Sequence, residues 1–159
     1  MSEQDYVGIL IESLEKKKEV LRAIQKQNEI QDSILSADEF DADAFDKTID
    51  DKEAFIGKLT FLDNGFNSIY ERVKVEINDK KEIYKTQILK LKELIEQVTE
   101  LGAAVEASER RNDLKFKNRF KGEHQKVRQS KASVKAVSGY YKNMSMSGAQ
   151  GSVYMDQKK

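Results

Sequence analysis

Apolar residues recur at steps of three, four and seven along the second half of the chain, which is the spacing of one face of an α-helix. The pattern is dense up to Val105, weakens beyond it, and strengthens again near the end. No proline interrupts it, and proline is the commonest sharp stop for a helix. It predicts one long helix from Asp79 or Lys80 to about Tyr141. The stripe consists of Tyr84, Ile88, Leu91, Ile95, Val98, Val105, Phe116, Phe120, Val127, Val134, Val137 and Tyr141.

The first half of the chain predicts two further helices. Residues 5–35 carry an apolar stripe with two polar breaks, Lys17 and Asn28, which is acceptable for a helix in a bundle. The second helix should run from near Ala42 to a break at residues 78–79. One local signal opposes it, because the pair Asn64-Gly65 usually marks a tight turn. The apolar phase continues across the glycine, so we expect an uninterrupted helix at a cost of about 1 kcal/mol. This glycine would also let another helix approach closely.

The connection between the first two helices is small and acidic. Asp41 or Asp43 can cap the second helix, since a carboxylate accepts from the free amides of the first turn. Phe40 precedes the cap and can pack on Phe45 or Ile49, as in a hydrophobic staple.

These elements predict an all-α fold, an antiparallel bundle of three long helices. At about 1.5 Å per residue the last helix would reach about 90 Å, so it is extended relative to the first, and its end must project, fold back or pair with a second copy. We expect a helical domain over residues 1–142 and a flexible tail over residues 143–159, because the tail is polar and rich in glycine and serine. It contains a small apolar anchor at Val153-Tyr154-Met155.

Composition supports helices. The chain has 159 residues, of which 35% are charged and 38% hydrophobic, without proline or tryptophan, which is typical of one helical bundle or coiled coil. The lack of cysteine excludes disulfides, cysteine zinc sites and thiol nucleophiles. The sequence contains no secretory apolar segment and no apolar run of about 18 residues, the length needed to span a membrane. We therefore expect a cytoplasmic protein that does not enter the membrane.

Charge is zero overall but distributed unevenly. Residues 29–63 carry eleven acids against three lysines, a net charge of −8, whereas residues 110–142 carry eleven bases against two acids, a net charge of +9. Two interpretations remain open. In the first, the two stretches are solvent-exposed faces of helices, and their opposite charges attract each other within the chain. In the second, the basic stretch is a surface for an acidic partner.

Little in the sequence indicates chemistry. The only histidine, His124, lies in the basic stretch and is expected at the surface. No glycine-rich phosphate loop or metal-binding motif occurs. Asp41, Asp43, Asp46 and Asp50 lack the central glycine and terminal glutamate of a calcium loop. We expect no catalytic residue, metal site or cofactor, and no enzyme activity.

Nucleic-acid binding is the main alternative for the basic stretch. Phosphate binding depends largely on cations, and Phe116 and Phe120 are interleaved with them and could stack on bases. The two phenylalanines are four residues apart and in phase with the apolar stripe, which favours burial between helices. Nucleic acid is therefore not an expected partner.

Short polar and aromatic markers are spread over nearly the whole chain. They are Phe45-Asp46-Lys47, Lys52-Glu53-Ala54-Phe55-Ile56, Leu62-Asp63-Asn64-Gly65-Phe66-Asn67-Ser68-Ile69-Tyr70, Glu109-Arg110-Arg111-Asn112, Arg128-Gln129-Ser130, Ala132, Ala136, Tyr140-Tyr141 and the ending from Val153. With the helical spacing, they resemble the flagellar type III export chaperones of the FlgN type.

The resemblance implies a cytoplasmic chaperone for flagellar hook-associated proteins. Such proteins hold a disordered helical end of the client with their C-terminal helical region and deliver it to the export gate or ATPase components. A tyrosine near the end of the last helix is implicated in the gate contact, which corresponds to Tyr140 or Tyr141. The client-binding candidates on this stripe are Phe116, Phe120, Val127, Val134 and Val137.

Two partners are possible for the part of the apolar stripe beyond Val105, where the apolar residues are sparse. A client segment could fold as an amphipathic helix in an unfilled groove, or a second copy could fill it as a homodimer. The alternative function is a structural coiled-coil or a basic nucleic-acid-binding protein.

Overall fold

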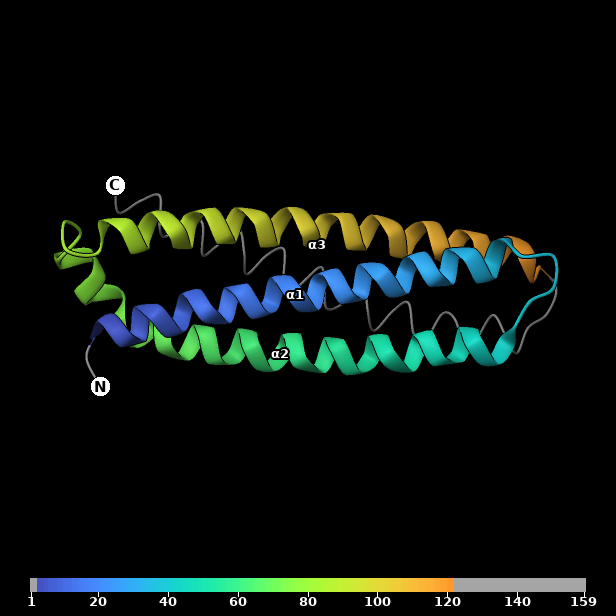
Figure 1. Cartoon of the computed structure of the whole chain (residues 1–159), viewed down its shortest axis with the longest axis horizontal. Helices are drawn as coiled ribbons and strands as arrows, with labels where there is room; N and C mark the ends of the chain where they lie inside the picture. The colour runs from blue at the N-terminus through green and yellow to red at the C-terminus, as the bar shows by residue number, and fades with distance from the viewer. Residues whose placement is uncertain (1–2, 122–159) are drawn as a thin grey trace.

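Three long helices make up the part of the chain that the structure describes. The computed structural model describes residues 3–121, in which α1 (Glu3–Ser36), α2 (Ala42–Asp79) and α3 (Lys85–Arg119) lie side by side (Figure 1). Successive helices run in opposite directions. The predicted all-α, antiparallel three-helix bundle is confirmed, and its helices are matched in length at 34, 38 and 35 residues.

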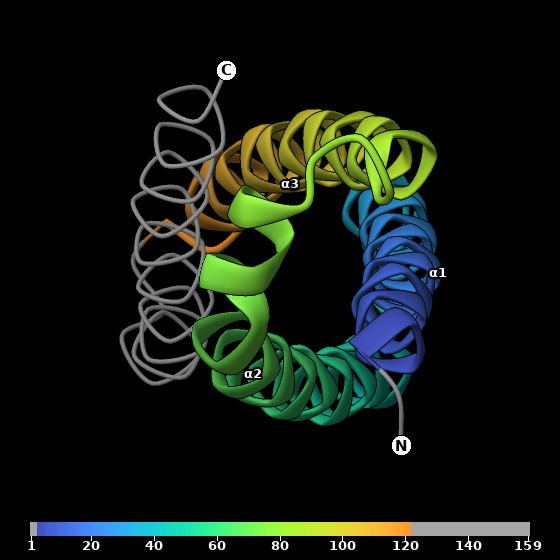
Figure 2. The ribbon, with the colours of Figure 1, turned by 90° about the vertical axis from the view of Figure 1, so that its left-hand side faces the viewer.

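α1 is the centre of the bundle. It packs against both α2 and α3, whereas the backbones of α2 and α3 do not approach each other closely anywhere in residues 3–121. Viewed from the end, the helices form an arc with α1 between the other two (Figure 2). Side chains therefore have to provide any link between α2 and α3.

The apolar stripes of the three helices meet in successive clusters along the bundle. The predicted positions on α3 from Tyr84 to Val105 belong to this core, with Ile88 and Ile95 half-buried. The first cluster is Val7, Leu10, Leu14, Val73, Ile77, Tyr84, Leu91 and Leu94; the second is Leu21, Ile24, Leu59, Val98 and Val105; the third is Leu35, Phe45, Phe116 and Phe120.

The start of α2 is fixed as the sequence predicts. The side chain of Asp41 accepts a hydrogen bond from the backbone N–H of Ala44 at 3.0 Å, so Asp41 rather than Asp43 is the cap. The ring of Phe40 lies 5.4 Å from that of Phe45, and Ile49 packs on the same cluster. The predicted packing of Phe40 on Phe45 is therefore present.

α2 continues through Asn64-Gly65, which confirms that the apolar phase outweighs the local turn signal. The expected close approach of another helix is wrong, however. Among residues 3–121, a Cβ built on Gly65 would have no atom within 4 Å other than those of its own stretch of helix backbone. The glycine therefore weakens the helix without serving any packing there.

We expect Gly65→Ala to stabilise the protein. Alanine removes the conformational penalty of an interior glycine, about 1 kcal/mol, and the new methyl group meets open space. For a chain of this size the melting temperature should rise by about 2–4 °C. Thermal unfolding followed by circular dichroism measures the change, and a lower melting temperature would contradict it.

α3 begins later than the sequence predicts. The helix break lies just beyond the predicted residues 78–79, since α2 ends at Asp79 and residues 80–84 form a turn, in which the backbone N–H of Tyr84 donates to the carbonyl of Lys80 at 3.2 Å. The helix starts at Lys85 instead of Asp79 or Lys80. The chain must reverse direction here, and it does so without a glycine or proline that would have marked the turn.

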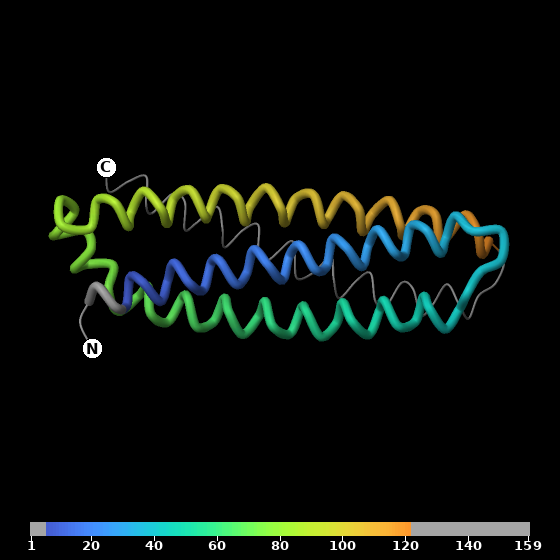
Figure 3. The backbone as a smooth tube through the Cα atoms, viewed as in Figure 1, coloured from blue at the N-terminus to red at the C-terminus, as the bar shows by residue number. Residues whose placement is uncertain are grey.

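α3 also ends earlier than predicted, although it passes without a break through Gly102. The predicted continuous helix to Tyr141 is wrong, because α3 ends at Arg119 and Phe120 has left the helical conformation at φ −108° and ψ 29°. The ring of Phe120 is buried beside Phe116. The C-terminal end of α3 and the α1–α2 loop lie at the same end of the bundle (Figure 3). His124, the boundary at residue 142 and the tail lie outside the described residues.

Candidate functional site

A buried ion pair joins α2 to α3. The Nζ atom of Lys52 lies 2.8 and 2.9 Å from the two carboxylate oxygens of Glu109. Lys52 also donates to the side-chain oxygens of Asn28, at 3.0 Å, and Gln31, at 2.9 Å. Lys52 and Glu109 are only 4% and 3% exposed. One ammonium group thus connects all three helices.

The polar layer extends around Asn28, which is 1% exposed. Its Nδ2 donates to Ser108 Oγ at 2.7 Å, and its backbone carbonyl oxygen accepts from Asn112 Nδ2 at 2.9 Å. The second polar break on α1, Lys17, forms an ion pair with Asp63 at 2.6 Å. Both breaks in the α1 stripe are therefore matched by polar residues on the neighbouring helices.

Burial sets the protonation behaviour of this layer. Desolvation lowers the pKa of Lys52 below its ordinary value of 10.5, and the adjacent Glu109 carboxylate opposes that effect by charge and hydrogen bonding. The folded chain therefore releases this proton at a lower pH than the unfolded chain does.

A pH dependence follows from this difference. Between the lowered pKa of folded Lys52 and 10.5, the unfolded state binds more protons, so the free energy of unfolding increases as the pH rises through that interval. We expect the unfolding free energy of the native chain, minus that of Lys52→Met, to rise as the pH increases toward 10.5. Urea unfolding at a series of pH values measures it, and a flat or falling difference would contradict the direction.

Two of the predicted client-binding residues, Phe116 in α3 and Phe120 at its C-cap, are buried within the bundle. Phe116 and Phe120 are 3% and 6% exposed. Phe116 stacks on Phe45 with 5.1 Å between ring centroids, and Phe120 meets Phe40 edge-on at 4.5 Å. This differs from the expectation of an open client groove at these two positions. Val127, Val134, Val137, Tyr140 and Tyr141 lie outside the described residues.

Arg119 fastens the α1–α2 loop over this aromatic cluster. Its guanidinium donates to the carbonyl oxygens of Leu35 at 3.0 Å and Asp38 at 2.9 Å, and also to that of Ala37. It lies 5.6 Å from the ring centroid of Phe40. Lys115 on the same helix forms an ion pair with Asp32 of α1. Part of the basic stretch thus serves attraction between the chain's own helices.

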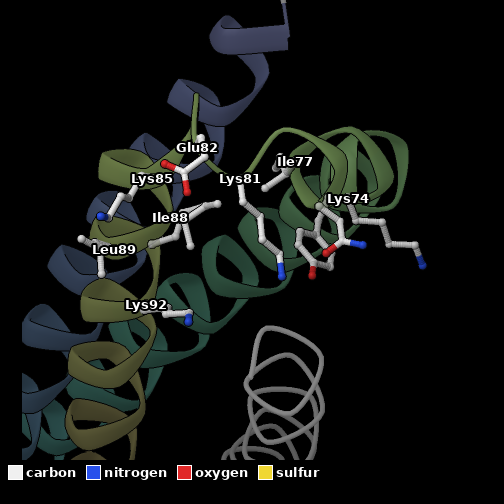
Figure 4. Close-up of a pocket in the computed structure, with 11 residues that line it drawn as sticks. Lys74, Ile77, Lys81, Glu82, Lys85, Ile88, Leu89 and Lys92 are labelled. Atoms are coloured by element: carbon white, nitrogen blue, oxygen red, sulfur yellow. The ribbon is translucent and has the colours of Figure 1, made fainter. Parts of the chain in front are cut away.

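A surface pocket of about 210 Å³ lies where α2 and α3 approach their connecting turn (Figure 4). Its apolar lining comes from Tyr70 and Ile77 of α2 and from Ile88 and Leu91 of α3. Four lysines surround these apolar residues, with Glu82 the single acid. The complete lining is Tyr70, Lys74, Ile77, Asn78, Lys81, Glu82, Lys85, Ile88, Leu89, Leu91 and Lys92.

The pocket and the polar layer differ in what they can do. The groups of the polar layer are enclosed and bonded to one another, so they suit a structural link. The pocket opens at the surface and offers apolar contact edged by positive charge. Residues 3–121 contain no group of histidine, cysteine, aspartate and glutamate side chains arranged to hold a metal ion, and none of their helices has the length and apolarity to cross a bilayer.

Comparison with known proteins leaves the family open. No protein-family model matches the chain, and neither curated proteins nor solved structures match it.

Proposed function

We propose that the chain is a non-catalytic, cytoplasmic export chaperone that holds a helical segment of a flagellar hook-associated protein and delivers it to the type III export apparatus. The observation that carries the proposal is the apolar pocket between α2 and α3, two helices whose backbones lie close to α1 and not to each other within the described residues. A pocket between such helices suits an added amphipathic helix. The resemblance to the FlgN type supports the same function.

The client supplies the helix in this proposal. A segment that is disordered when free can fold on binding and follow an extended surface. Val127, Val134 and Val137 are proposed as further client contacts, and Tyr140 or Tyr141 as the contact with the export gate. Phe116 and Phe120 instead hold the bundle together, since both are buried in its aromatic cluster.

Co-purification with a hook-associated protein tests the proposal. We expect the intact client to be retained and a client truncated at its terminus to be lost. Equally poor retention of both would overturn the proposal. Steep salt dependence of binding to generic single- or double-stranded DNA would instead favour a nucleic-acid-binding protein.

The two tyrosines should separate delivery from binding. We expect replacement of both Tyr140 and Tyr141 by alanine to reduce export of the client while co-purification stays unchanged. Client appearing in the culture medium measures export. If the double substitution abolishes co-purification, these tyrosines belong to the client contact and the proposed gate contact is wrong.

A further inference from the structure

We propose that the pocket between α2 and α3 docks an acidic amphipathic helix. One or two apolar side chains of the partner would enter between Ile77 and Ile88, and its carboxylates would lie beside Lys81 and Lys85. That the docked helix belongs to the client rests on the proposed function. That it is acidic and amphipathic rests on the shape and charge of the pocket.

The size of the pocket favours protein side chains over a small ligand. Its volume of about 210 Å³ lies below the roughly 300–1,000 Å³ of typical small-molecule sites. Apolar surface also continues outside it at Ile83, which is 62% exposed, and Leu89 of the lining is itself 60% exposed. A helix that inserts one or two side chains and covers these residues would bury both the pocket and its surroundings.

The charge around the pocket favours an acidic partner. Lys74, Lys81, Lys85 and Lys92 surround the apolar residues (Figure 4), and Glu82 is the single acid among the lining residues. Residues 74–92 carry a net charge of +3. The rest of the chain before residue 122 is strongly acidic, because residues 3–121 together carry −5. The pocket is thus a local basic area on an acidic body.

The same charge disfavours the chain's own C-terminal segment as the occupant. Residues 122–159 contain seven bases and two acids, a net charge of +5. Placing this segment against a ring of lysines would bring like charges together, which is unfavourable at an interface. A glutamate-rich helix meets no such repulsion, and it leaves the lysine ammonium groups near water and carboxylates.

Two synthetic peptides of about 18 residues provide the test, long enough to form helix on binding. Both carry leucine at helical positions i, i+3, i+4 and i+7. One has glutamates on its remaining face, and the matched peptide has lysines there. Fluorescence anisotropy with the full chain should show binding of the glutamate peptide and at least about tenfold weaker binding of the lysine peptide.

Charge reversal on the protein should reverse this preference. Lys81→Glu with Lys85→Glu should weaken the glutamate peptide about tenfold and strengthen the lysine peptide. Lys47→Glu with Lys58→Glu, two exposed lysines of α2 outside the pocket lining, is the matched control and should change binding less than about twofold. Leu89→Asp tests the apolar contact and should abolish binding of the glutamate peptide.

Several results would overturn the inference. These are equal binding of the two peptides, no binding of either, or equal effects of the two lysine pairs. A homodimer that the Lys81→Glu, Lys85→Glu variant loses would assign the pocket to a second copy. Retention of a hook-associated protein by that variant would reject this docking site while leaving the proposed function intact.

Discussion

Glu109→Gln should lower the free energy of unfolding by about 3–5 kcal/mol. The substitution leaves the ammonium of Lys52 buried without a countercharge, and removing one partner of a buried ion pair has an effect of this size. Glutamine keeps the shape of the side chain and one of its acceptors, so the loss reports the missing charge. Urea unfolding monitored by circular dichroism at neutral pH measures it.

Two further variants identify the cause. Glu106→Gln removes the partner of exposed Arg110, one turn earlier on α3, and should change stability by no more than about 0.5 kcal/mol. The pair Lys52→Met with Glu109→Leu removes both charges and should recover most of the stability, because apolar replacements of buried ion pairs are often neutral or stabilising. If Glu109→Gln lowers the free energy of unfolding by no more than Glu106→Gln does, the ion pair does not hold α2 to α3.

Phe116→Ala should also destabilise the protein by about 3–5 kcal/mol, the usual range for removing a buried ring. Phe116 contacts Phe45 and Phe120 at centroid distances of 5.1 and 4.7 Å. Its loss would open a cavity under the α1–α2 loop. Thermal and urea unfolding measure the effect.

Leu114 provides the matched control on the same helix. It is 60% exposed, so Leu114→Ala should alter stability by no more than about 0.5 kcal/mol. The comparison also separates the two roles considered for Phe116. If Phe116→Ala leaves stability unchanged and removes client binding, the sequence-based assignment to the client is right and the structural one is wrong.

The sequence predicted the course of α2 well, because one dominant signal controls it. The apolar residues on both sides of Gly65 keep a single phase, and burying that face outweighs a local turn preference. Asn28 and Lys17 were recognised as breaks in the α1 stripe. What the stripe alone did not predict is that each break faces a polar partner on another helix, since pairing between helices depends on their relative register.

Lys52 and Glu109 illustrate that limit. Lys52 follows Ile49 by three residues, and Glu109 follows Val105 by four, so both occupy core positions of their helices. The available signal was a pair of opposite charges on different helices, each at the spacing of the buried apolar positions. The spacing within each helix gives no hint of a buried link, because nothing in one helix tells which residue of another helix lies opposite.

The end of α3 was missed for a different reason. Phe120 fits the helical stripe, and the residues around it contain no proline. The helix ends there because the bundle ends there, where Phe120 packs under the α1–α2 loop and Arg119 bonds to the loop carbonyls. Tertiary contacts of that kind stop a helix without leaving a local sequence mark.

The central place of α1 has a consequence for how the chain is made. Synthesis proceeds from the N-terminus, and structure can form as segments emerge from the ribosome. α1 and α2 can pair into a hairpin first, since their contacts require nothing from α3. In such a hairpin Lys52 would lack Glu109, which α3 supplies only when it packs on the other two helices. Substitutions at Glu109 should therefore speed unfolding and leave hairpin formation unaffected.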